Sequence, residues 1–138
     1  MSAANPLHVA IQKAQRLLQQ NQADEALEAL NGVLTDDPDN AEALLTVAVA
    51  ERARGNHDQA LQTLDKLLSL RPNFGRALQE KGINEVGKQN LVAAGRAFED
   101  AVNADPALLN SWQALAKLYH DSGQAADAAN AKDKVSFL

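Results

Sequence analysis

The 138-residue chain has no cysteine, which excludes disulfides and thiolate metal sites. Aromatic residues make up only 4% of it, too few for a typical packed sheet, and Ala, Leu and Gln are plentiful. This balance favours close-packed helices. No apolar run is long enough to span a bilayer, and no basic stretch followed by an apolar one marks a signal peptide. We therefore expect a soluble, cytoplasmic protein.

Other features that the sequence lacks exclude several classes of function. The net charge of -5 repels phosphate backbones, so nucleic-acid binding is not expected. His8, His57 and His120 lack the spacing of metal ligands. The sequence has no Gly-x-Ser-x-Gly, no cysteine nucleophile and no dinucleotide-binding glycine pattern. We expect no cofactor, no metal and no catalytic site within these residues.

What the sequence does contain is a 34-residue repeat. Pro38, Pro72 and Pro106 follow one another at this step. Several other columns keep residue size at the same period. Two columns are small and one is bulky: Ala14, Ala48, Gly82 and Ala116; Ala26, Ala60, Ala94 and Ala128; and Leu30, Leu64 and Phe98. Small residues let two helices approach closely, and the bulky ones fill the space toward the next repeat.

Each repeat predicts two helices, because apolar residues recur three and four positions apart and no segment alternates with period two. Gly55 and Gly123 mark turns within repeats. Asn5, Asn40 and Asn73 offer side-chain oxygens that could cap the following helices. The expected helices are 5–20, 24–36, 41–54, 58–70, 75–88, 92–104, 109–122 and 125–137.

The period and the last repeat resemble the tetratricopeptide repeat (TPR) family. Trp112, Leu115, Ala116 and Tyr119 match its pattern W-x2-L-G/A-x2-Y. The resemblance implies an all-α fold, a right-handed α–α superhelix or TPR solenoid of four helix-turn-helix repeats and about eight helices. The repeats would be residues 7–40, 41–74, 75–108 and 109–138 of a single domain. It also implies a protein-binding scaffold with a concave groove.

Two departures from the family pattern stand out. Glu51 and Glu85 occupy the place of Tyr119. They either form a paired carboxylate site or pair locally with Arg54 and Lys88, three residues on.

The second departure is Lys132, which replaces the bulky column and suits a polar end cap. The apolar residues after it, Val135, Phe137 and Leu138, either fold back, contact a partner or lead into a longer chain.

One near-match to a phosphate-binding loop is rejected. Residues 82–88 read G-x4-G-K, but Gln89 stands where Ser or Thr would hold magnesium. The segment also lies inside an expected helix, where Gly82 already serves as the small residue of its repeat.

The first helix of each repeat lines the concave groove in this family. Its centre here is apolar and its rim polar, which is typical of a peptide-binding or helix-binding groove. The alternative is that some of the aliphatic residues pack on neighbouring helices. The expected groove residues are Ile11, Gln15, Glu42, Leu45, Thr46, Val49, Arg52, Arg76, Gln79, Glu80, Ile83, Val86, Asn110, Gln113, Lys117 and His120.

Some family members clamp the terminal carboxylate of a chaperone tail with basic and amide side chains. The matching places here hold Ile11, Gln15, Thr46 and Glu80, and only Arg76 suits the task. Because Glu80 would repel a carboxylate, we do not expect this chain to bind such a tail.

Three functions remain open. The first is an adaptor that binds a peptide or helix of a partner protein. The second is the N-terminal scaffold of a larger enzyme, since residues 109–116 loosely resemble the TPR region of bacterial TPR-sulfotransferase-like proteins. The third is self-association through the C-terminal helix at Phe137 and Leu138.

Overall fold

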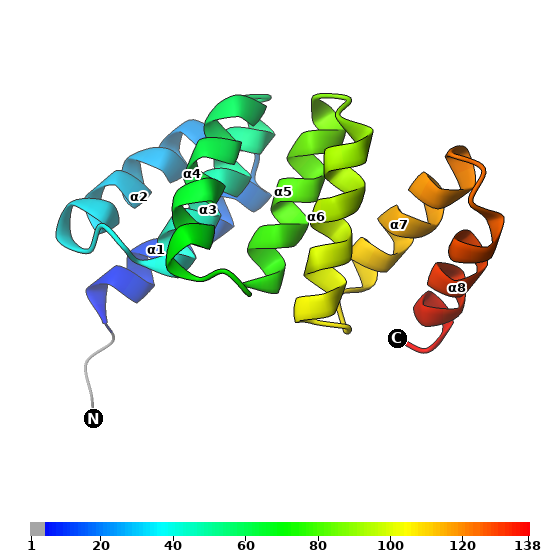
Figure 1. Ribbon diagram of the computed structural model, residues 1–138. Helices are drawn as coiled ribbons and strands as arrows, with labels where there is room; N and C mark the ends of the chain where they lie inside the picture. Colours follow the sequence, from blue (N-terminus) through cyan, green and yellow to red (C-terminus); the bar gives the residue numbers. More distant parts are fainter. Residues whose placement is uncertain (1–4) are drawn as a thin grey trace. The chain divides into compact units, whose positions relative to one another are not determined.

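The computed structural model describes residues 5–138, and these residues form helices and turns without a strand (Figure 1). Each observed helix boundary lies within one residue of its expected position, so the all-α repeat fold is confirmed. The helices are α1 (Pro6–Gln19), α2 (Ala23–Asp36), α3 (Ala41–Ala53), α4 (His57–Leu70), α5 (Gly75–Gly87), α6 (Leu91–Ala104), α7 (Leu109–Asp121) and α8 (Ala125–Ser136).

Two of the three expected asparagine caps are present. The Asn5 side chain accepts a hydrogen bond from the Leu7 amide at 2.9 Å, and Asn40 accepts one from the Ala43 amide at 3.0 Å. Each bond satisfies an amide that lacks a partner in the first helical turn. The cap predicted at Asn73 is wrong. Helix α5 starts one residue later than that cap requires, so its N-cap is Phe74, whose side chain makes no capping bond.

The turn inside every repeat contains a residue with positive φ. Gly55 and Gly123 both have a φ of 80°, as their residue type suggests. The two equivalent positions in the other repeats are Asn21, with a φ of 60°, and Gln89, with a φ of 65°. The same turn geometry therefore recurs at the 34-residue step, even where the residue is not glycine.

The helices group into two compact units, and the chain passes from the first to the second between Leu70 and Arg71. Unit 1 contains α1 to α4 and unit 2 contains α5 to α8, so each unit holds two repeats. The single domain expected from the sequence stays a prediction.

Each unit has its own core, built from the repeat columns. In unit 1, Leu30 and Leu64 of the bulky column are fully buried. In unit 2, Phe98 of the same column is buried, while Lys132 is exposed, as expected for the outer face of a last helix. The core clusters are Ile11, Ala14, Ala26, Leu30, Val33 and Ala43 in unit 1, and Ala94, Phe98, Val102, Leu115, Ala116 and Ala131 in unit 2.

Among residues 5–138, no helix combines the length and the apolar character needed to cross a membrane. The cytoplasmic location stays a prediction.

Candidate partner-binding face

The expected groove residues of unit 1 lie on α1 and α3, and several of them are not open to solvent. Ile11 belongs to the core cluster of its unit, and Leu45 is buried as well. Thr46 is buried too, and its hydroxyl donates to the Glu42 carbonyl oxygen at 2.7 Å. Leu45, expected in the open apolar centre, is thus enclosed.

The reason is the position of α3 within unit 1. This helix packs against α1, α2 and α4, so it has little free surface on any side. Spacing along one helix cannot reveal how many neighbours surround it. The remaining expected residues of this unit, Gln15, Glu42, Val49 and Arg52, are half-buried.

The expected residues of unit 2 lie on α5 and α7 in two equivalent stripes. On α5 the stripe runs through positions 76, 79, 80, 83 and 86, and on α7 through positions 110, 113, 117 and 120. The two stripes differ by the 34-residue repeat. Steps of three and four residues place each stripe on one side of its helix. We call the two stripes together the α5–α7 face.

A polar contact joins these two helices. The Ser111 hydroxyl donates to the Gln79 side-chain oxygen at 2.7 Å, and Ser111 is fully buried. Asn84 is also fully buried, and its side-chain amide donates to the Glu80 carbonyl oxygen at 2.9 Å. The bond from the buried Ser111 hydroxyl helps to fix the position of α7 relative to α5, whereas the Asn84 bond lies within α5.

Burial divides the α5–α7 face into a closed part and an open part. Glu80 is buried, and Ile83 packs partly against the core of unit 2, which is the alternative the sequence had left open for the aliphatic residues. The open part combines one aliphatic side chain, Val86 at 42% exposure, with polar and basic ones. These are Arg76, Asn110, Gln113, Lys117 and His120.

Two buried polar residues, Asn84 and Ser111, were not singled out from the sequence. The column of Asn84 gave no signal, because its equivalent positions hold Arg16, Ala50 and Leu118, which share neither size nor polarity. Ser111 did give a signal, since it is the polar residue in a column that otherwise holds the apolar Val9, Ala43 and Ala77.

The local pairing expected for Glu51 is confirmed. Its carboxylate accepts a hydrogen bond from the Asn56 side chain at 2.9 Å and lies 3.8 Å from the Arg54 guanidinium. The same guanidinium lies 2.8 Å from the Asp24 carboxylate. Because Arg54 and Asp24 are exposed, this pair contributes little to stability.

The segment that resembled a phosphate-binding loop is helical. Gly82 lies within α5, and a Cβ atom added there would stand 2.7 Å from the Phe98 ring. Gly82 is therefore the small residue of a tight helix contact. Over the described part of the chain, no group of three or more His, Cys, Asp or Glu residues could hold a metal ion.

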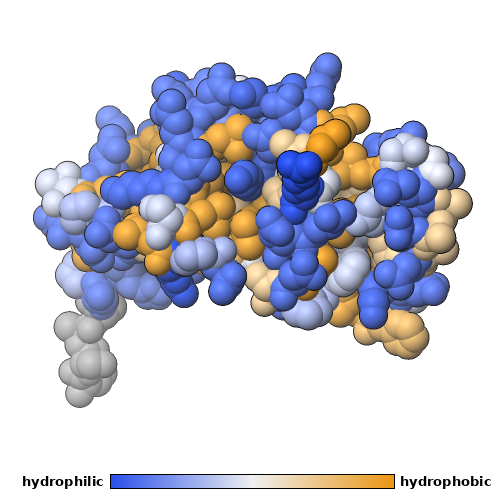
Figure 2. Space-filling model, in the orientation of Figure 1, coloured by the Kyte–Doolittle hydropathy of each residue, from blue (hydrophilic) through white to orange (hydrophobic). Residues whose placement is uncertain are grey.

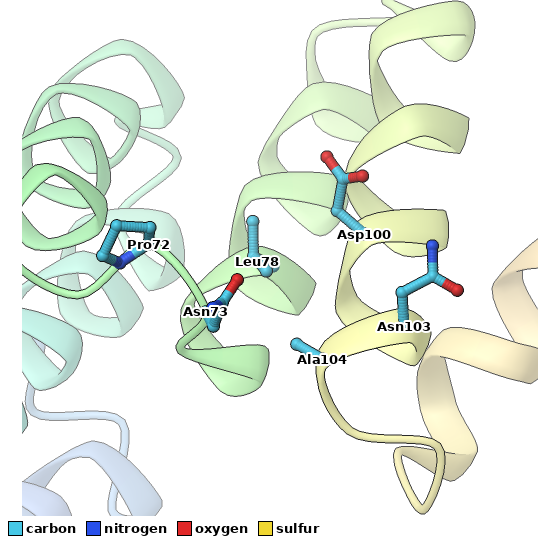
Figure 3. Close-up of a pocket in the computed structure, with 6 residues that line it drawn as sticks. All are labelled: Pro72, Asn73, Leu78, Asp100, Asn103 and Ala104. Atoms are coloured by element: carbon cyan, nitrogen blue, oxygen red, sulfur yellow. The ribbon is translucent and has the colours of Figure 1, made fainter.

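Unit 2 also contains surface hollows, and two of them are of interest. The first, of about 500 Å³, is lined by polar and apolar residues in equal number from the loop before α5, from α5 and from α6 (Figure 3). Its lining residues are Pro72, Asn73, Leu78, Asp100, Asn103 and Ala104.

The second hollow, of about 400 Å³, lies between α6 and the end of α7, and we call it the α6–α7 hollow. Its lining is largely apolar, with Leu91, Val92, Leu118 and Tyr119, and its other lining residues are Gly95, Arg96, Glu99, Asp121, Ser122 and Gln124.

Tyr119 stands in this second hollow with a defined partner. Its hydroxyl donates to the Glu99 carboxylate at 2.6 Å. Burial and this hydrogen bond to a carboxylate both raise the pKa of Tyr119 above its ordinary value of 10.0.

Comparison with known proteins supports the repeat family. A tetratricopeptide repeat family profile matches residues 17–80. Protein O-mannosyl-transferase TMTC1 of Homo sapiens is 29% identical over 122 residues, which are 83% of this chain and 14% of that protein. Protein SGT1 homolog of Bos taurus is 35% identical over 89 residues, which are 63% of this chain and 26% of that protein. The chain thus spans 14% and 26% of the length of these two relatives.

Solved structures show the same fold at low identity. The crystal structure of MamA has a TM-score of 0.82 at 18% identity and covers 95% of this chain and 77% of that one. The first TPR of Spaghetti (RPAP3) bound to the HSP90 peptide SRMEEVD has a TM-score of 0.78 at 18% identity, covering 88% of this chain and 96% of that one. The fold of this chain is therefore that of a tetratricopeptide-repeat array.

Proposed function

We propose that this tetratricopeptide-repeat chain is a non-catalytic interaction module that holds a peptide or helix of a partner protein. The fold commonly mediates protein–protein interaction, and a solved relative in fold carries a bound peptide. We place the contact on the α5–α7 face of unit 2.

The observation that carries this proposal is the composition of the open part of that face. Val86 offers an exposed aliphatic anchor near the end of α5, and the exposed polar side chains of Lys117 and His120 lie near the equivalent end of α7, one repeat further on. An apolar anchor beside polar groups suits a peptide, because apolar burial supplies affinity and hydrogen bonds fix register. The same side of unit 1 offers a peptide less exposed apolar surface, since Ile11 and Leu45 are buried.

The charges of the face indicate an acidic segment. Its exposed charged residues are Arg76 and Lys117, whereas the carboxylate on the face, Glu80, is buried. A peptide with Asp or Glu beside an apolar side chain would therefore meet complementary charge.

The bound peptide of the RPAP3 neighbour is acidic as well, but a different mode of binding is expected here. In this chain three of the places that would clamp a chaperone tail are buried: Ile11, Thr46 and Glu80. The Ile11 side chain has neither a hydrogen-bond donor nor a charge with which to bind a carboxylate. The Glu80 carboxylate would repel one. We therefore propose an internal acidic segment rather than a terminal tail.

A selection from a random displayed-peptide library tests this proposal. We expect the selected peptides to be enriched in Asp and Glu next to an aliphatic or aromatic residue. The variant Lys117→Glu should lose them, while Lys13→Glu, an exposed charge reversal in unit 1, should retain them. Selection of basic peptides, or equal retention by both variants, would contradict the assignment of the face.

A second candidate is a repeat region that belongs to a larger enzyme. It is favoured by relatives named as transferases, TMTC1 and the UDP-N-acetylglucosamine--peptide N-acetylglucosaminyltransferase SPINDLY of Hordeum vulgare. This chain covers 14% of each. The bacterial sulfotransferase-like origin stays a prediction. Sequencing the transcript beyond codon 138 tests this candidate, since a stop codon directly after Leu138 would remove it.

A further inference from the structure

The segment after α8 carries two large apolar side chains in solvent. Phe137 is 87% exposed and Leu138 is 53% exposed. In Figure 2 the chain end is coloured as hydrophobic. Apolar side chains of this size lose unfavourable contact with water when another surface covers them. Among the three outcomes expected for this segment, folding back onto its own unit is therefore not observed.

The α6–α7 hollow, in the same unit, has an apolar lining that suits side chains such as those of Phe137 and Leu138. Leu91 and Val92 stand at its mouth with 52% and 74% exposure, and Leu118 and Tyr119 line it from α7. Figure 2 shows hydrophobic surface near the turn between α5 and α6. An exposed apolar segment that binds in an exposed apolar hollow would bury apolar surface on both.

Phe137 and Leu138 cannot reach the α6–α7 hollow of their own chain. Gln124 lines the hollow and directly precedes α8, whereas Phe137 follows the far end of α8 (Figure 1). The 12 residues of α8 span about 18 Å. Residues 137 and 138 together extend about 7 Å at most. The two features can meet only between copies.

The charges near the two features are complementary. Lys132 and Lys134 are exposed on the last turns of α8, and Asp133 lies between them. The rim of the hollow holds two carboxylates, Glu99 and Asp121, and one guanidinium, Arg96. Glu99 accepts the Tyr119 hydroxyl and keeps further acceptor capacity. The end of α8 thus carries two lysines and one carboxylate, and the rim of the hollow carries two carboxylates and one guanidinium.

We propose that Phe137 and Leu138 of one copy insert into the α6–α7 hollow of a second copy. Donor and acceptor are different surfaces, so the contact is head-to-tail and each copy can bind one copy before it and one after it. The contact area is small, which makes the association weak and concentration-dependent. This proposal uses a different face from the partner-binding proposal and is independent of it.

Sedimentation equilibrium of the 138-residue chain over a concentration series tests the proposal, with two variants. Phe137→Ser removes the donor and Val92→Asp closes the acceptor. Both side chains are exposed, so folding should be retained, which circular dichroism and melting would verify. We expect the wild type to grow beyond a dimer with concentration and each variant alone to remain a monomer.

The mixture of the two variants is the decisive sample. Phe137→Ser retains an intact hollow and Val92→Asp retains an intact segment, so an equimolar mixture should form heterodimers and stop there. Leu109→Ser, an exposed apolar change elsewhere in unit 2, should associate like the wild type. A monomeric wild type, single variants that still associate, or a mixture without heterodimers would each overturn the proposal.

Discussion

Gly82 of α5 lies directly against the ring of Phe98 of α6. A Cβ atom at position 82 would stand 2.7 Å from the Cε1 and Cζ atoms of that ring. Real Cβ contacts are essentially never that short, and the ring is buried. The small column and the bulky column of the repeat thus meet at this contact in unit 2.

The first prediction concerns this contact. Gly82→Ala should lower the free energy of unfolding by about 1–3 kcal/mol, because the ring or the helix must shift. Gly95→Ala is the matched control within α6, since a Cβ there meets nothing within 4 Å. It should stabilise by roughly 0.5–1 kcal/mol through helix propensity. Denaturant unfolding measures both, and equal effects would refute the packing role of Gly82.

The second prediction concerns the positive φ of Gln89. A residue with a side chain in the left-handed region is strained by about 1–2 kcal/mol. Replacing it with glycine removes this strain, but glycine loses more backbone entropy on folding, which offsets part of the gain. Gln89→Gly should therefore raise the free energy of unfolding by roughly 0.5–1 kcal/mol. Gly55→Ala, at the equivalent turn, should change it in the opposite direction. If both changes move the melting temperature the same way, the account of the turn is wrong.

The third prediction separates the real cap from the false one. Asn40→Ala removes the bond to the Ala43 amide and should cost about 0.5–2 kcal/mol. Asn73→Ala should leave stability nearly unchanged, because α5 has Phe74 as its N-cap. Thermal unfolding of the two variants provides the comparison, and a loss at Asn73 as large as at Asn40 would contradict the observed start of α5.

The fourth prediction uses the single tyrosine of the chain. The raised pKa of Tyr119 means that the folded state holds the phenolic proton more tightly than the unfolded state does. Its contribution to stability is fully present below the unfolded pKa of 10.0 and is lost as the pH rises above that value. Ultraviolet absorbance of the phenolate should therefore titrate above pH 10 in the folded chain.

Glu99→Gln is the control for this titration. It removes the negative charge beside the hydroxyl and should bring the pKa part of the way back toward 10.0, while burial still raises it. A wild type that titrates at the same pH as the unfolded chain would contradict the Tyr119–Glu99 geometry.

Much of the fold was predictable because the repeat supplies the same information four times. Columns such as Leu30, Leu64 and Phe98 fix helix positions to within one residue. Features that depend on one backbone detail were not predictable. The position of Gln89 holds no glycine that would indicate its positive φ, and the sequence did not show that Phe74 rather than Asn73 is the N-cap of α5.

The candidate face was predictable only as a pattern. Spacing placed Leu45 and Val86 on equivalent sides of their helices, but Leu45 is buried and Val86 is 42% exposed. Burial depends on helices that are distant in the sequence, such as those that surround α3. The sequence therefore indicated the side of each helix and could not indicate which parts stay open.

The central claim is that a partner peptide binds the open part of the α5–α7 face. Isothermal titration of a library-selected acidic peptide into Val86→Asp and Val9→Asp tests it most directly. The two valines are matched, with 42% and 44% exposure, and they lie on α5 and α1. We predict that Val86→Asp weakens binding by at least about tenfold, equivalent to roughly 1.4 kcal/mol, and that Val9→Asp has no effect. Unchanged affinity in Val86→Asp, with a peptide that still binds the wild type, would contradict the account.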